Sequence, residues 1–326
     1  MKVSVIICSY NYANYLPQCL SSVMNQTCLP DEVIVIDDGS TDETLEVVKR
    51  FDGVRYIRQE HMGKAAAFNR GVEASSGDLI CHLDADDYWF EQKLRHLLDI
   101  FRRFPNAGGI IHDAVIIYGD ETPPKDLPSG GPPKSMSLQD MILSSFLYLP
   151  KRYRKFRGYY YGRWAITPFA GGISIRKDVI EPYIPLPTDI NLSVDGLLCY
   201  VASTSTLIYL PEVLSVYRHH GRNYWRSNPH AMQGQIRLYQ WLMNNPVFSK
   251  YLSKKQQKLL LAKLAEDAFL YELIGGPRLC DLPRPALPSL LMATGVLPGW
   301  KHWAMGLAFP IAKVARQIVY RLKGKA

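Results

Sequence analysis

The chain has 326 residues, 38 Lys and Arg against 30 Asp and Glu, and a formal net charge of +8. A hydrophobic fraction of 47% and a charged fraction of 21% exclude a disordered chain and a polytopic membrane protein, and the length suits one large α/β domain or two smaller ones. Residues 282–326 contain seven Lys and Arg and no acid, so the first 281 residues carry a net charge of only +1. A nearly neutral body with a basic tail argues against a nucleic-acid-binding protein.

Short apolar runs alternate with helix-like segments over the first third of the chain. This alternation of apolar runs and helix-like segments predicts a mostly parallel sheet flanked by crossover helices. Ligands of an open α/β sheet bind beyond the carboxyl ends of its strands, so the residues after each apolar run are the candidates for a site. The predicted strands are 3–8, 33–37, 54–58, 79–83 and 109–117, and the predicted helices are 14–25, 42–50, 64–74 and 91–103.

The pattern changes after residue 117. Residues 118–134 contain five prolines and three glycines, which predicts a mobile loop that could act as a lid. Two further strands, 167–176 and 207–217, flank a helix that starts near Asp195. We therefore divide the chain into 1–117, 118–228 and a helical C-terminal region, 229–326.

Three carboxylates follow the fourth predicted strand: Asp84, Asp86 and Asp87. Carboxylates this close repel one another unless a cation or strong donors lie among them. Asp84 and Asp86 can direct oxygens at one divalent ion and leave its other positions for phosphate oxygens. The alternative is a solvated turn in which Asp87 caps the helix that begins near Phe90. We favour a site for a metal ion and a diphosphate.

The turn after the first strand separates classes of nucleotide-binding protein. It contains Ser9, Tyr10 and Asn11 in place of a G-x-G-x-x-G turn, and no G-x-x-x-x-G-K-[ST] loop is present. The sequence therefore favours nucleotide binding without phosphotransfer. A sugar nucleotidyltransferase would require a Gly-rich, Arg-containing loop at this position, which makes it a weaker alternative.

Four motifs in order resemble family 2 glycosyltransferases of the GT-A fold. They are VSVIICSYN at 3–11, followed by QT at 26–27, then VIDDGSTD at 35–42, GKAAAFNRG at 63–71 and GDLICHLDADD at 77–87. The resemblance is specific over about the first 115 residues and is weaker beyond them. It implies an inverting transfer of a sugar from a nucleoside diphosphate to a hydroxyl, with a catalytically inactive nucleotide-sugar-binding protein as another alternative.

The resemblance also implies roles for individual donor-site residues. Ser9, Tyr10 and Asn11 would contact the donor nucleotide, with the Tyr10 ring stacked on the base. Asp38 would accept hydrogen bonds from the base or ribose, and Lys64 would meet the diphosphate. Asp86, with Asp84, would hold Mn²⁺ or Mg²⁺ between the two phosphates.

The acceptor half supplies the remaining candidates. The resemblance implies that Asp195 is the base that deprotonates the acceptor hydroxyl, with Asp189 as the competitor and a helix N-cap as the structural alternative. His220 would be a third metal ligand or a phosphate contact, with His219 and Arg218 as alternatives. The other histidines considered have no visible partners and are assigned structural roles: His61, His82, His96 and His112.

The C-terminal tail predicts where in the cell the protein works. Pro310 can open a helix with apolar residues on one face and basic residues on the other, the pattern of a helix lying in a membrane interface, although docking on the protein body is the alternative. The basic and aromatic segment 147–164 could share this role or hold an anionic lipid-linked acceptor. The six cysteines have no pairing pattern and no export signal is visible, which predicts a cytoplasmic enzyme at the membrane's inner face. Its expected partners are a UDP-sugar and a glycan or lipid-linked acceptor.

Overall fold

The computed structural model describes residues 1–124, 131–144, 152–156, 159–163, 172–188, 194–220, 231–261 and 264. It contains two compact units: Met1–Met141 with Lys151–Ser227, and Ile142–Pro150 with Asn228–Ala326. Asp189, residues 125–130 of the predicted lid and the basic tail lie outside the described residues, and so do parts of segment 147–164.

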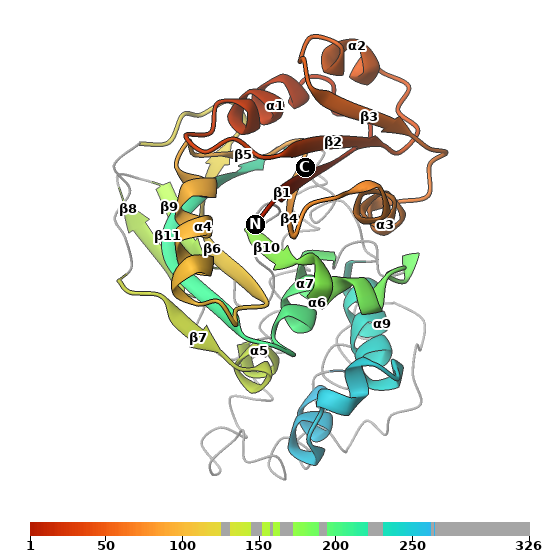
Figure 1. Ribbon diagram of the computed structural model, residues 1–326, viewed down its shortest axis with the longest axis vertical. Helices are drawn as coiled ribbons and strands as arrows, with labels where there is room; N and C mark the ends of the chain where they lie inside the picture. Colours follow the sequence, from red (N-terminus) through yellow and green to blue (C-terminus); the bar gives the residue numbers. More distant parts are fainter. Residues whose placement is uncertain are drawn as a thin grey trace, which may run out of the picture. The chain divides into compact units, whose positions relative to one another are not determined.

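A large mixed sheet forms the centre of the first unit (Figure 1). Its strand order is β3-β2-β1-β4-β10-β6-β11-β5. β1 pairs in parallel with β2 and β4, β2 with β3, and β6 with β11, while β10 runs antiparallel between β4 and β6. The central strands are β1 (Val3–Ser9), β2 (Glu32–Asp37), β3 (Val54–Arg58), β4 (Leu79–Asp84), β6 (Gly109–Tyr118), β10 (Ile173–Arg176) and β11 (Leu207–His219).

Shorter strands extend this sheet antiparallel to their neighbours. β5 (Tyr88–Trp89) and β7 (Lys134–Met136) pair with β11, and the hairpin of β8 (Arg152–Phe156) and β9 (Tyr159–Arg163) pairs with β6. All five strands predicted in the first third are present, and the α/β fold class is confirmed.

Helices cover both faces of the sheet. α1, α2 and α4 lie against one face, and α3, α6 and α7 lie against the other. Helix α1 carries a proline in its first turn, where its missing N–H costs no hydrogen bond. The bounds are α1 (Leu16–Met24), α2 (Thr44–Val48), α3 (Lys64–Ala74), α4 (Lys93–Arg103), α5 (Leu138–Ser144), α6 (Lys177–Ile180), η1 (Glu181–Tyr183) and α7 (Val194–Ala202).

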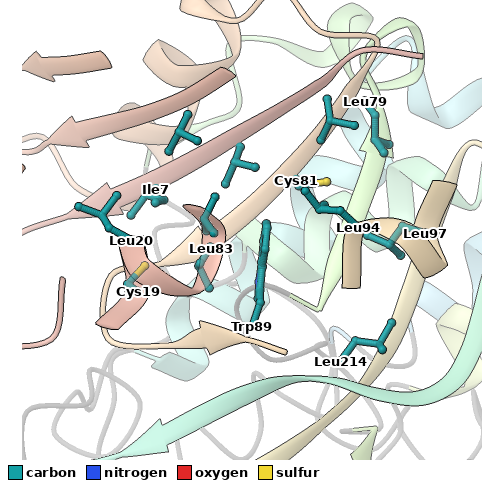
Figure 2. Close-up of a cluster of buried hydrophobic side chains, with 14 of the residues drawn as sticks. Ile7, Cys19, Leu20, Leu79, Cys81, Leu83, Trp89, Leu94, Leu97 and Leu214 are labelled. Atoms are coloured by element: carbon teal, nitrogen blue, oxygen red, sulfur yellow. The ribbon is translucent and has the colours of Figure 1, made fainter. Parts of the chain in front are cut away.

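The hydrophobic core on the first face accounts for the alternate apolar residues of β1 and β4. Figure 2 shows Ile7 and Leu83 from these strands packed with Leu20 of α1 and Leu94 of α4, with Trp89 beside them. Alternate residues of a strand point to opposite faces, so the residues between these core positions face α3 and α7. Strands buried on both faces read as continuous apolar runs, which is the pattern that predicted them.

Several later predictions are confirmed only in part. The predicted strand 167–176 is described from residue 172, where β10 forms, and 207–217 is confirmed as β11. The described cysteines, Cys8, Cys19, Cys28, Cys81 and Cys199, form no disulfide among themselves.

The second unit is helical where it is described. Helix α9 (Ala231–Asn244), the short helix η3 (Phe248–Tyr251) and helical residues 254–261 follow one another. Ile236, Tyr239 and Leu242 are buried and recur every three residues along α9. Within the described part of the chain, no helix has the length and apolar character needed to cross a membrane.

Gly71 lets helix α3 approach strand β1 closely. A Cβ atom at this position would lie 2.4 Å from Cγ2 of Ile6, closer than such atoms can approach. The helix carries Lys64 at its first position, so this close contact also fixes where the Lys64 side chain begins.

We expect Gly71→Ala to destabilise the protein by about 1–2 kcal/mol in denaturant unfolding. Overpacking costs about 1–3 kcal/mol, and the higher helix propensity of alanine offsets at most about 1 kcal/mol. In an Ile6→Ala background the same substitution should cost less, because the clashing methyl group is gone. An equal cost in both backgrounds would contradict this explanation.

Candidate active site

The strand ends meet at one edge of the sheet. In the parallel pairs, Ser9 lies opposite Asp37 and Cys8 lies opposite Asp84. Asn11 connects the first two of the loops that follow, because its backbone N–H donates to Ser40 Oγ at 2.9 Å and its Oδ1 accepts from the Thr41 N–H at 2.8 Å. Its φ of 57° lies in the left-handed region, which asparagine tolerates better than most residues. The described contacts of Asn11 thus connect two loops.

Asp38 is buried and surrounded by donors. Its Oδ1 accepts hydrogen bonds from Gln59 Nε2 at 2.7 Å and the Met62 N–H at 2.9 Å, and its Oδ2 accepts one from the Gly63 N–H at 2.8 Å. His61 Nδ1 also lies 2.8 Å from Oδ2. These bonds hold the segment that leads into α3, so a nucleotide contact to Asp38 would have to share or displace one of them.

Tyr10 presents an aromatic surface beside this carboxylate. Its ring stacks on His61 with centroids 3.9 Å apart and an angle of 17° between the planes, and the residue is 41% exposed. Ser9 is different, because its Oγ is buried and has no hydrogen-bond partner in the described part of the chain. A role in base stacking remains a prediction for Tyr10, as does nucleotide contact for Ser9.

Lys64 connects the acidic turn to the acceptor half. Its Nζ lies 2.8 Å from both carboxylate oxygens of Asp84 and 3.1 Å from Asp195 Oδ2. Burial lowers the pKa of Lys64, but the two carboxylates outweigh this effect and hold the pKa above its ordinary value, so the ammonium persists. The structure therefore brings together three residues that the sequence analysis placed in separate roles.

Asp195 is buried in the first turn of α7 and is held from two sides. Its Oδ1 lies 3.0 Å from His82 Nδ1, while its Oδ2 takes the Lys64 contact. Burial raises the pKa of Asp195, but Lys64 and His82 outweigh burial and hold the pKa below its ordinary value. The contacts described for this carboxylate go to side chains of β4 and α3, whereas a helix cap would bind the backbone of α7.

The acidic turn forms the third part of the site. Oxygens of Asp84, Asp86 and Asp87 all lie within 4.8 Å of one another. Asp87 Oδ1 accepts a hydrogen bond from the Arg218 N–H at 2.9 Å, on β11, which does not support the alternative that Asp87 caps the following helix. Burial, with repulsion from Asp86 and Asp84, raises the pKa of Asp87 well above its ordinary value. Burial also raises the pKa of Asp84, although Lys64 opposes the shift.

The end of β11 reaches this turn because β5, which directly follows the three aspartates in sequence, pairs with β11. His220 Nε2 lies 3.0 Å from Asp86 Oδ2, and its ring stacks on Tyr15 with centroids 4.8 Å apart. Arg218 is buried and donates through Nε to the Asp86 carbonyl at 3.2 Å, and it also contacts Gln18. His219 instead packs against Tyr118. The structure thus favours His220 over His219 as the histidine of the site.

These residues fit a hard divalent cation. Asp87 Oδ2 is buried with no hydrogen-bond partner among the described residues. Burial first, and then repulsion from neighbouring carboxylates, raises the pKa of Asp84 and of Asp87, and a cation bound among these oxygens would offset both effects. Carboxylate oxygens are the ligands that Mn²⁺ and Mg²⁺ prefer. Asp84, Asp86 and His220 remain the predicted ligands, and Asp87 joins them as a candidate.

Sequence reasoning assigned His82 a structural role and missed its partner, Asp195. It also missed the partners of His61, which contacts Asp38, and of His96, whose Nδ1 bonds Glu212. A signal for His82 was present, because residues two apart on a strand share a face and His82 precedes Asp84 by two.

The comparisons with known proteins agree with this geometry. The family model described as "Glycosyl transferase family 2" matches residues 4–181, which is more than half of the chain. The chain belongs to glycosyl transferase family 2. An uncharacterized glycosyltransferase of Nostoc sp. is 32% identical over 230 residues, a match that covers 68% of this chain and 66% of that relative.

Two solved structures of glycosyltransferases are similar to this chain in fold. S. aureus TarS 1–349, determined in complex with UDP-GlcNAc, matches with a TM-score of 0.61 and 17% identity over 90% of this chain and 80% of that one. The mannosyltransferase PcManGT from Pyrobaculum calidifontis, determined with GDP-Man and Mn²⁺, matches with a TM-score of 0.54 and 19% identity over 97% of this chain and 87% of that one. At such identities the likeness confirms the GT-A fold.

We expect Mn²⁺ or Mg²⁺ to raise the unfolding temperature of this family 2 protein by several degrees, because a ligand that binds only the folded state stabilises it. Asp86→Asn should abolish the shift, and chelation should reverse it. Asp178→Asn, which changes an exposed aspartate paired with Arg176, should leave the shift intact. A shift of equal size in Asp86→Asn would show that the cation binds elsewhere.

Proposed function

We propose that this chain transfers a sugar from a nucleoside diphosphate sugar to a hydroxyl of a glycan or lipid-linked acceptor, with inversion at the anomeric carbon. The carrying observation is the Lys64 ammonium, which lies 2.8 Å from Asp84 and 3.1 Å from Asp195. A base and the candidate diphosphate site are thereby within the reach of one lysine side chain. An acceptor hydroxyl next to Asp195 would then lie near a sugar held by its diphosphate.

In this reaction Asp195 accepts the proton of the acceptor hydroxyl. The hydroxyl oxygen forms a bond to the anomeric carbon, and the bond from that carbon to the diphosphate oxygen breaks with its electron pair left on the diphosphate. Attack opposite the leaving group inverts the configuration. Asp84, Asp86 and His220 would hold a divalent cation, which when bound neutralises the charge developing on the leaving diphosphate.

Lys64 has two tasks in this proposal. In the structure its ammonium is shared between two carboxylates. A donor diphosphate offers more negative charge than either carboxylate, so the ammonium would shift toward it when the donor binds. That shift removes the cation that holds the pKa of Asp195 low, and Asp195 becomes a stronger base when the donor is in place.

The donor nucleoside is proposed from the structural neighbours. TarS 1–349 was determined with UDP-GlcNAc and with UDP, and PcManGT was determined with GDP-Man. Release of nucleotide from UDP-, GDP- and dTDP-sugars with Mn²⁺ and detergent-solubilised lipid acceptors tests the proposal, with a UDP-sugar as the expected donor. No release from any donor would contradict transferase activity.

Asp195→Asn should lower kcat by about 10²- to 10⁴-fold, the usual contribution of a positioned base. The affinity for UDP with Mn²⁺, measured by titration calorimetry, should not fall, because Asp195 acts on the acceptor and its loss only frees Lys64 for the diphosphate. Asp113→Asn is the control, since Asp113 is a buried aspartate that pairs with Tyr209 on neighbouring strands. Undiminished transfer by Asp195→Asn would eliminate Asp195 as the base.

We further propose that the enzyme works in the cytoplasm, peripherally on the inner face of the cell membrane. The support is sequence alone, because the basic segment 282–326 lies outside the described residues. Deleting residues 300–326 should release the protein from vesicles that contain anionic lipid, measured by co-sedimentation. Unchanged binding by the shortened chain would refute the anchor.

A further inference from the structure

His82 lies at the junction of three elements of the site. It is on β4, it is 0% exposed, and its Nδ1 lies 3.0 Å from Asp195 Oδ1 on α7. Its ring meets Phe68 of α3 edge-on, with centroids 5.3 Å apart and an angle of 87° between the planes. The imidazole is therefore fixed by packing as well as by its contact with Asp195.

The hydrogen of this contact belongs to the histidine. As the proposed base, Asp195 must be ionised before it accepts a proton, Lys64 holds its pKa below the ordinary value, and an ionised carboxylate can only accept hydrogen bonds. His82 Nδ1 must then carry a hydrogen. The other ring nitrogen, Nε2, lies 3.5 Å from Asp84 Oδ1 and makes no hydrogen bond within the described residues.

The two anchors of Asp195 hold different oxygens. Lys64 binds Oδ2 and His82 binds Oδ1. If Lys64 moves to a donor diphosphate, Oδ2 is released and only the bond to His82 keeps the carboxylate in place. A buried ring held by Phe68 loses little conformational freedom in this task, whereas a lysine side chain has many rotamers.

We propose that His82 is a positioning residue for sugar transfer: its Nδ1–H holds Oδ1 of Asp195 and leaves Oδ2 directed at the acceptor hydroxyl. The proposal rests on the proposed function, in which Asp195 is the base. It assigns His82 no contact with the sugar, and it requires only the Nδ1 side of the ring.

A matched pair of variants tests this requirement. The side-chain nitrogen of Asn is as many bonds from the backbone as Nδ1 of histidine, and that of Gln is as far as Nε2. His82→Asn should therefore retain most of the turnover, whereas His82→Gln should lower kcat by about 10²-fold, the effect of a misplaced catalytic group. KM for the donor and affinity for UDP with Mn²⁺ should stay near wild type in both. The same substitutions at His96, on α4, should leave kcat and KM unchanged.

A purely structural role predicts a different pattern. Loss of packing would affect both variants according to their fit in the core, so equal turnover in the two would overturn the proposal. A second check combines His82→Gln with Asp195→Asn, where no further loss in kcat is expected because His82 acts through Asp195. If Asp195→Asn is inactive but His82→Gln is not, only the positioning role fails. If Asp195→Asn is fully active, the proposed base fails as well.

A measurement on the wild-type chain tests the proposal even if the variants do not fold. The ¹⁵N spectrum of the histidine side chains, with His82 assigned by correlation to its own backbone, reports which ring nitrogen carries hydrogen. We expect a protonated Nδ1 in His82. A neutral ring with hydrogen only on Nε2 would overturn the proposal.

Discussion

The parallel pairing of β1 with β2 and β4 determines where the rest of the site lies. Because Ser9 is opposite Asp37 and Cys8 is opposite Asp84, the three loops that follow these strands begin at one edge of the sheet. The strands are buried on both faces, so helices must cover each face. Two of these helices, α3 and α7, lie on the same face and bring Lys64 and Asp195 to the edge where the strands end.

The carboxylates at this edge outnumber the cations that contact them among the described residues. Asp84 and Asp195 share one ammonium, and Asp86 and Asp87 lie beside them with His220 and the Arg218 backbone as their described partners. Buried charges of one sign oppose folding unless opposite charges compensate them. A divalent cation bound among these carboxylates would reduce their mutual repulsion. A bound diphosphate would attract the Lys64 ammonium.

The sequence predicted the parts of the site that are contiguous. The apolar runs placed β1 to β4 within a residue or two, and the acidic turn was visible because its three aspartates are neighbours. The contact from Lys64 to Asp195 spans 131 residues and has no local signal. The approach of His220 to Asp86 depends on the pairing of the two-residue strand β5 with β11, which no periodicity can reveal. The partner of His82 could not be predicted because Asp195 lies on α7, 113 residues further along the chain.

The bonds around Asp38 bear on any attempt to redesign donor choice. This carboxylate binds the Met62 and Gly63 N–H groups, and Lys64 begins α3 immediately after them. Under the proposed function, a substitution at Asp38 intended to accommodate another base would also remove the bonds that hold the segment before Lys64. If the nucleotide binds here as proposed, its preference is better altered at Tyr10, whose residue is 41% exposed and whose ring stacks on His61.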